Sequence, residues 1–152
     1  MKALELKIHP PIVLLFCLCL AYVLSHYLPL LALPSILSSL YGYIGATGVL
    51  LSLAGIWEFR KAKTTIDPTK PENASQLVSG GVYRITRNPM YLGMLFINIA
   101  TIFKFSNYYG FIALPVFIVY ITQFQIKPEE RIIEDVFGEE YVHYKKKVRR
   151  WL

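Results

Sequence analysis

Residues 8–57 contain no aspartate, glutamate, lysine or arginine. A bilayer core about 30 Å thick takes roughly twenty apolar residues as a helix, so this stretch can hold two membrane spans and a short turn. His26, Pro29 and Pro34 mark the turn. We predict spans at about residues 10–30 and 35–57. The alternative, a water-soluble helical protein, would need a partner to cover so much apolar surface.

A second apolar stretch runs from Met90 to Ile126 and is interrupted by Lys104, Ser106 and Asn107. It predicts spans at about 90–105 and 108–126, of which the first is short and either tilted or partly re-entrant. The chain is therefore predicted to be a single all-α domain over residues 1–152, a polytopic membrane protein. We expect about four transmembrane helices in two hairpins, a polar loop at 58–89 and a polar tail at 127–152.

The lysines and arginines are unevenly placed in this chain of net charge +6. Two precede the first predicted span, six lie in the loop, one is Lys104 and seven follow Ile126. By the positive-inside rule, both termini and the loop are cytoplasmic, as in a multi-pass protein of a bacterial or archaeal inner membrane. The basic end of the tail suits an interfacial helix on anionic headgroups. Nothing resembles a nucleic-acid module, so no nucleic-acid partner is expected.

Small residues form one face of the second predicted span. Such a face lets helices approach closely in lipid, so we interpret it as a helix-packing surface. Its members are Gly42, Gly45, Ala46, Gly48, Ser52 and Gly55.

Two polar clusters flank the second apolar stretch. In the first, Gly80-Gly81 permits a tight turn or a close approach to a ligand, and Asn88-Pro89 predicts an N-cap with helix three starting at Pro89. A structural alternative places Arg84 and Arg87 among headgroups, with Tyr83 and Tyr91 in the interfacial aromatic belt.

In the second cluster, Lys127–Arg131 predicts a new helix at the membrane exit with Glu129 and Glu130 in its first turn, and Gly138 predicts its end. Beyond it, Tyr141, Tyr144, Val148 and Trp151 recur at helical spacing. Carboxylates near the headgroup boundary require a partner. In the structural interpretation, that partner is Arg84, Arg87 or Arg131 in an ion pair. In the functional interpretation, it is a cationic ligand, which the ring faces of nearby tyrosines would also attract.

The two clusters, in this order, resemble the integral-membrane methyltransferases of the isoprenylcysteine carboxyl methyltransferase and phospholipid N-methyltransferase superfamily. The first match comprises residues 81–83 and 87–93. The second comprises Glu129-Glu130, then Phe137, Gly138, Tyr141, Tyr144 and Val148, ending at Arg150-Trp151. The resemblance covers about the last half of the chain. It implies methyl transfer from S-adenosylmethionine at the cytoplasmic face to a lipophilic or membrane-associated acceptor.

The resemblance also implies roles for individual residues. Glu129 and Glu130 would line the reaction centre as catalytic residues, and Gln125 and Glu129 would contact the acceptor. The residues implied to bind the cofactor are Gln76, Leu77, Val78, Tyr83, Arg87, Asn88, Pro89, Met90 and Tyr91. In-line displacement at a methyl group mainly requires alignment, and a carboxylate could accept a proton from an amine or thiol nucleophile.

The chain departs from the family pattern at two positions. Asn88 replaces a histidine, and Gln125 stands where the isoprenylcysteine enzymes have an arginine suited to a substrate carboxylate, with Lys127 and Arg131 as the nearest substitutes. A non-catalytic scaffold or transporter is the second hypothesis. A transporter usually places ionisable residues within its spans, and here only His26 and Lys104 lie near span ends. The scattered histidines His9, His26 and His143 predict no metal site.

Overall fold

The computed structural model describes residues 4–152 and confirms the all-α prediction. Within those residues the only β pairing is an isolated bridge between Ala32 and Asn107. The α-helices are α1 Pro10–Tyr27, α2 Ser35–Ser39, α3 Tyr41–Lys61, α4 Pro89–Phe105, α5 Ala113–Tyr120, α6 Lys127–Phe137 and α7 Glu139–Lys147. Shorter helical turns are η2 Pro71–Asn73, η3 Gly81–Arg84, η4 Tyr108–Ile112 and the π-helical η5 Ile121–Ile126.

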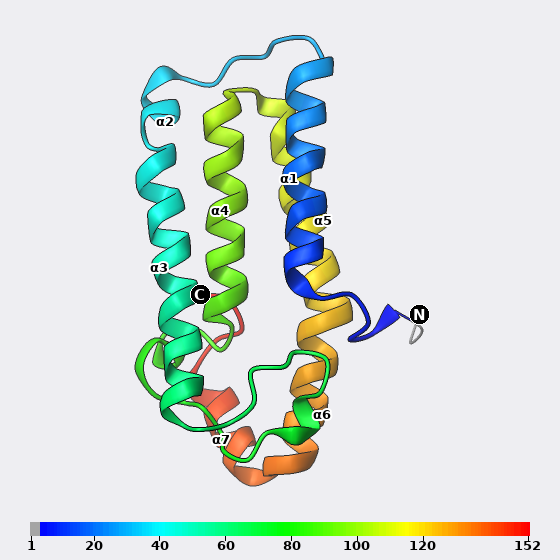
Figure 1. Ribbon diagram of the computed structural model, residues 1–152, viewed down its shortest axis with the longest axis vertical. Helices are drawn as coiled ribbons and strands as arrows, with labels where there is room; N and C mark the ends of the chain where they lie inside the picture. Colours follow the sequence, from blue (N-terminus) through cyan, green and yellow to red (C-terminus); the bar gives the residue numbers. More distant parts are fainter. Residues whose placement is uncertain (1–3) are drawn as a thin grey trace.

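The long helices α1, α3, α4 and α5 lie side by side, while α6, α7 and the loop after α3 gather at one end (Figure 1). Three helical stretches are long and apolar enough to cross a membrane: Pro10–Tyr27, Tyr41–Lys61 and Tyr108–Phe137. The fourth, α4, is apolar but only 17 residues long. The expected four spans in two hairpins therefore remain a prediction.

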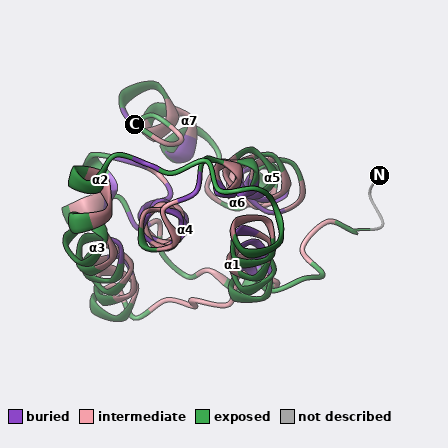
Figure 2. Cartoon of the chain, turned by 90° about the horizontal axis from the view of Figure 1, so that it is seen from above, coloured by how far each residue is buried: buried purple, intermediate pink, exposed green. Residues whose placement is uncertain are grey.

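Helix α4 occupies the middle of the bundle, between α3 and the pair α1 and α5 (Figure 2). The close contact of α4 with α3 requires glycine at the interface. A Cβ on Gly93 would lie 2.4 Å from the Gly48 carbonyl oxygen. Ser52 Oγ also lies 3.4 Å from the Met90 carbonyl oxygen. The packing interpretation of the small-residue face is thus confirmed around Gly48 and Ser52, whereas Gly42 has open space around it.

At the other end of the bundle, the connection that follows α1 forms hydrogen bonds with the connection that follows α4. The Leu33 amide donates to the Ser106 carbonyl at 3.1 Å, and the Tyr108 amide donates to the Leu31 carbonyl at 2.9 Å. Asn107, which is fully buried, donates from Nδ2 to the Ser25 carbonyl at 3.1 Å. These bonds satisfy backbone groups that an apolar environment would leave without a partner.

Helix α6 begins at Lys127 as expected, but it continues the preceding turns without a break. Tyr108–Phe137 is one continuous helical stretch, with the π-helical turn just before Pro128. A proline inside a helix cannot bond the carbonyl four residues earlier. Here that carbonyl, on Phe124, accepts a 3.0 Å hydrogen bond from the Leu6 amide instead. The charged half of the stretch, from Lys127, is thereby rigidly joined to its apolar half.

The end of the chain is also less helical than predicted. α6 ends before Gly138 as expected, but α7 stops at Lys147, and Val148 is extended with φ −121° and ψ 133°. The expected helical face therefore does not reach Trp151. Instead, the C-terminal segment, residues 148–152, turns back toward the start of α4.

Candidate functional site

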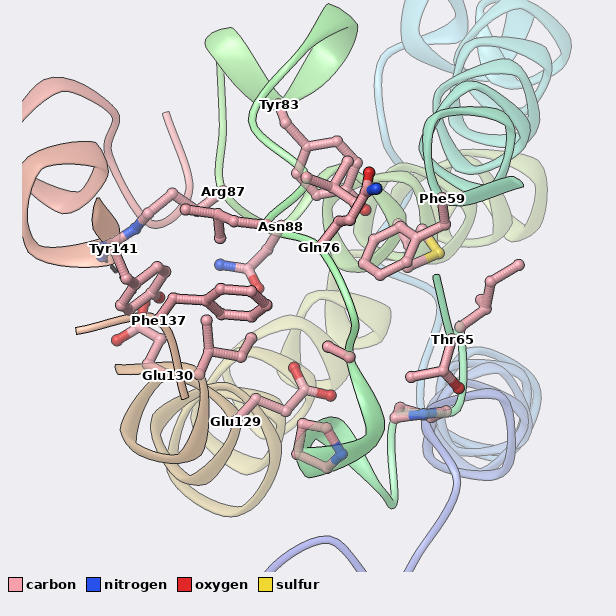
Figure 3. A pocket seen from close by; sticks show the side chains of 18 of the residues that line it. Phe59, Thr65, Gln76, Tyr83, Arg87, Asn88, Glu129, Glu130, Phe137 and Tyr141 are labelled. Atoms are coloured by element: carbon pink, nitrogen blue, oxygen red, sulfur yellow. Dashed lines mark ion pairs between the residues drawn. The ribbon is translucent and has the colours of Figure 1, made fainter. Parts of the chain in front are cut away.

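A cavity of about 110 Å³ lies at the end of the bundle where α6, α7 and the loop meet (Figure 3). Most of the residues that the resemblance implicated lie around it: Gln76, Leu77, Val78, Tyr83, Arg87, Asn88, Met90, Tyr91, Glu129 and Glu130. Two do not line it. Pro89 is buried at the start of α4, and Gln125 lies behind Glu129. The structure thus assembles both sequence clusters at one place.

The turn before α4 fixes Tyr83. Gly81 has φ +52°, a conformation that favours glycine, and the Glu58 carboxylate occupies the space where a Cβ would stand. Tyr83 is buried, its ring lies edge-on to Phe59 at 5.6 Å, and its carbonyl accepts a 2.6 Å bond from the Tyr144 hydroxyl. Burial raises the pKa of the Tyr83 phenol well above its usual value, so the ring stays neutral.

Asn88 does not cap the helix with its side chain as expected. Helix α4 does start at Pro89, but Asn88 Nδ2 donates to the Arg150 carbonyl at 2.9 Å. The neighbouring Thr86 hydroxyl donates to the same carbonyl at 3.2 Å and accepts from the Asn88 amide at 3.2 Å. The side-chain amide of Asn88 therefore forms a tertiary contact with the C-terminal segment instead of capping α4.

Glu129 has only uncharged partners. The Tyr91 hydroxyl donates to Glu129 Oε1 at 2.7 Å, and Gln125 Nε2 donates to the same oxygen at 2.6 Å. No lysine or arginine within residues 4–152 forms an ion pair with it. The carboxyl group is half-buried and points into the cavity (Figure 3). Burial raises the pKa of Glu129 to about 7, because a low-dielectric environment disfavours the charged form.

Glu130 is instead fully paired. Arg87 Nη2 lies 2.9 Å from Glu130 Oε1, and Arg150 donates to both carboxylate oxygens, from Nε at 3.1 Å and from Nη2 at 2.6 Å. The expected structural ion pair thus exists at Glu130, with Arg87 as one partner. The second partner, Arg150, was not predicted from the sequence. Arg87 Nε is buried and has no hydrogen-bond partner in the described part of the chain.

The other cations considered from the sequence lie away from the cavity. Arg131 forms an exposed ion pair with Glu5, and Lys127 donates to Gln123 at 2.8 Å on the surface. Arg84 is exposed and is absent from the cavity lining. The arginine missing at Gln125 is therefore not replaced by Lys127 or Arg131.

Sequence reasoning missed several residues around the cavity. Ile133 and Phe137 follow Glu130 at helical spacings of three and seven residues, and this could have placed them beside it. No sequence signal marks the loop residues, because their place depends on long-range contacts such as the 2.7 Å bond from Gln125 Nε2 to the Pro68 carbonyl and the packing of η2 against α6. The missed lining residues are Phe59, Thr65, Ile66, Asp67, Pro68, Pro71, Ala74, Ile133, Phe137, Tyr141 and Tyr144.

Comparisons with known proteins agree with this arrangement. The phospholipid methyltransferase family matches residues 37–140, more than half of the chain. The chain therefore belongs to that family of membrane methyltransferases.

Three relatives illustrate the similarity. An uncharacterised protein of Haemophilus influenzae is 46% identical over 63 residues, which are 41% of this chain and all of that protein. Protein-S-isoprenylcysteine O-methyltransferase B of Arabidopsis thaliana is 30% identical over 101 residues, 66% of this chain and 51% of the relative. The Saccharomyces cerevisiae protein-S-isoprenylcysteine O-methyltransferase is 36% identical over 83 residues, 53% of this chain and 34% of the relative.

The matched regions thus span about half or less of the two methyltransferases. No solved structure matches the chain significantly.

Proposed function

We propose that this chain is an integral-membrane methyltransferase that takes its methyl group from S-adenosylmethionine and modifies a lipophilic or membrane-associated acceptor at the cytoplasmic face. One observation carries the proposal: Glu129 places a carboxylate, whose partners among residues 4–152 are all neutral, inside a cavity walled by aromatic rings. A buried carboxylate of this kind is stabilised by a cationic ligand.

The chemistry of the lining residues fits S-adenosylmethionine, which supplies a methyl group on a positively charged sulfur. Glu129 offers the opposite charge, and Tyr83 and Tyr91 offer ring faces that attract cations. Arg87, a cationic residue of the lining, offers a charge that suits an anionic group of the ligand. The stretch Gln76–Val78 with Asn88 and Met90 completes the wall around it.

The two glutamates have different proposed roles. Glu129 attracts the cation and can accept a proton from an amine or thiol acceptor, since a pKa of about 7 suits a base at neutral pH. Tyr91 and Gln125 hold its Oε1 in place. Glu130, paired with Arg87 and Arg150, contributes by fixing the position of cavity groups.

The position of the cavity along the bundle supports an acceptor that arrives from the bilayer. Glu129 lies less than one helical turn beyond the predicted span 108–126, and Tyr91 lies in the first turn of α4. The site is thus at the boundary between apolar and charged segments, where a lipid or lipidated substrate presents its polar part. The printed names of the Arabidopsis and yeast relatives, which describe methyltransferases of isoprenylcysteine, favour the same class of acceptor.

The experiment that tests this function is a calorimetric titration of S-adenosylhomocysteine into the detergent-purified protein. We expect saturable binding to the wild type and much weaker binding to Tyr91→Ala, because Tyr91 contacts both Glu129 and the cavity. Tyr108→Ala is the matched control, since Tyr108 is exposed at the opposite end of the bundle. Absence of binding to folded wild type would disprove the proposed function.

A further inference from the structure

The C-terminal segment, residues 148–152, is bound along the chain that leads into α4. The Arg87 amide donates to the Arg149 carbonyl at 3.0 Å, and the side chains of Thr86 and Asn88 both donate to the Arg150 carbonyl. On its other side, Trp151 Nε1 donates to Thr122 Oγ1 at 3.3 Å. The segment thereby joins the start of α4 to the π-helical turn.

The side chain of Arg150 adds a charged contact to these backbone bonds. Its guanidinium binds both oxygens of Glu130 in a two-pronged arrangement, which is the geometry that a planar guanidinium forms best. Glu130 also pairs with Arg87, and the side chains of Glu130 and Arg87 are only 11% and 10% exposed. The carboxylate therefore bridges two arginines that are far apart in the sequence.

Three residues that line the cavity depend on Arg150, although Arg150 does not line it. Glu130 is held by its guanidinium, Arg87 is held through Glu130, and Asn88 is held by its carbonyl. Arg87 Nε is itself buried and has no hydrogen-bond partner within residues 4–152.

We propose that Arg150 is a positioning residue: it locks the C-terminal segment against the cavity and sets Glu130, Arg87 and Asn88 for ligand binding. This inference rests on the proposed function, because it takes the cavity to be the binding site for the methyl donor. Without Arg150, Glu130 keeps only its ion pair with Arg87 and loses the two hydrogen bonds that fix the carboxylate, so the Glu130–Arg87 pair is less well held. The affinity for the ligand falls, because ligand binding must then also order buried charged groups that are not held in place.

Arg149 provides a matched control. It is the adjacent arginine and carries the same charge, but its side chain is exposed and forms no ion pair within residues 4–152. Replacing either arginine by alanine changes the net charge equally, so only the Glu130 contact differs between the two variants.

The test measures the dissociation constant of S-adenosylhomocysteine for the wild type, Arg150→Ala, Arg150→Lys and Arg149→Ala, with the melting temperature of each ligand-free protein recorded alongside. We expect Arg150→Ala to weaken binding by about tenfold or more, the scale of a charged hydrogen bond. Arg150→Lys should be intermediate, because an ammonium cannot bind both oxygens in the same way. Arg149→Ala should stay within about twofold of the wild type, the range of an ordinary surface substitution.

A double-mutant cycle separates positioning from a general loss of stability. Glu130→Gln and Arg150→Gln are combined, and their effects on the dissociation constant should be strongly non-additive, since each acts through the same contact. The cycle also serves if Arg150→Ala does not fold. Additive effects, or equal affinities of the Arg150 and Arg149 variants, would overturn the inference while the wild type still binds. Failure of the wild type to bind would instead overturn the proposed function, and this inference with it.

Discussion

Glu129 and Glu130 are adjacent in the chain but have opposite electrostatic environments. Glu130 contacts two guanidinium groups, whereas Glu129 Oε1 receives hydrogen bonds only from the Tyr91 hydroxyl and the Gln125 amide. The side chains of consecutive helical residues point about 100° apart, so Glu129 and Glu130 can contact different groups from the same helical turn. The carboxylate of Glu129 is consequently the one of the two that has no ion pair and is open to a cationic ligand.

The first prediction concerns the pH dependence of stability. The pKa of Glu129 rises from 4.5 to about 7 in the folded protein, so the folded state holds this proton more tightly than the unfolded chain does. The free energy of unfolding should therefore fall as the pH rises between these two values. We expect the melting temperature of the ligand-free wild type to decrease from pH 5 to pH 8. In Glu129→Gln the decrease should be smaller, by about 3 °C for each kcal/mol of unfolding free energy that Glu129 no longer loses over this range.

Glu139→Gln is the control for this measurement, because Glu139 is exposed on α7. Its melting temperature should follow the wild type across the same pH range. If Glu129→Gln also follows the wild type, then Glu129 titrates as an ordinary surface carboxyl and the account of its environment is wrong.

A second prediction concerns Gln125, which joins the π-helical turn η5 to the loop. Its Nε2 donates both to the Pro68 carbonyl and to Glu129, so Gln125→Ala leaves the loop without this attachment. We expect faster amide hydrogen exchange at residues 62–80 and a weaker affinity for S-adenosylhomocysteine, by about fivefold for a lost buried hydrogen bond. Gln123→Ala, on the exposed side of the same turn, should change neither. Unchanged exchange in Gln125→Ala would show that the loop is held by other contacts.

A third prediction tests the packing of α4 against α3. Gly93→Ala places a methyl group 2.4 Å from the Gly48 carbonyl oxygen and 3.0 Å from the Ser52 amide nitrogen, so backbone must move. We expect a loss of about 2 kcal/mol or more, as for overpacked cores. Gly42→Ala meets nothing within 4 Å and should be neutral or stabilising by up to about 1 kcal/mol, since alanine favours helix. Denaturation of both variants in the same detergent provides the comparison, and equal stabilities would contradict the predicted contact.

Local signals in the sequence predicted the elements well. Pro10 and Pro89 begin helices where expected, and Gly138, with φ +52°, ends α6. These outcomes follow from backbone preferences that act within a few residues. The start of α6 at Lys127 was also predicted, but its continuity with the preceding turns was not, because a distant residue, Leu6, supplies the hydrogen bond that Pro128 cannot donate.

The candidate site was predictable only in part, for the same reason. The motifs indicated which residues gather, but not which glutamate would be neutralised, because that depends on Arg150 returning from the end of the chain. Asn88 had the sequence of an N-cap, and its side chain was diverted by the same segment. The loop around Pro68 carries no motif, and it is held at the cavity by a hydrogen bond from Gln125 and by the packing of η2 against α6. Long-range contacts of this kind have no signature in a local pattern.

The most direct test of the central claim compares two ligands that differ in charge at sulfur. S-adenosylmethionine is positive at that atom and S-adenosylhomocysteine is neutral, so their affinities for wild type and Glu129→Gln isolate the interaction between the carboxylate and the cation. The account predicts that Glu129→Gln weakens binding of S-adenosylmethionine about tenfold, near 1.4 kcal/mol, and of S-adenosylhomocysteine less than about twofold. Equal losses for the two ligands, or no loss for either, would contradict it.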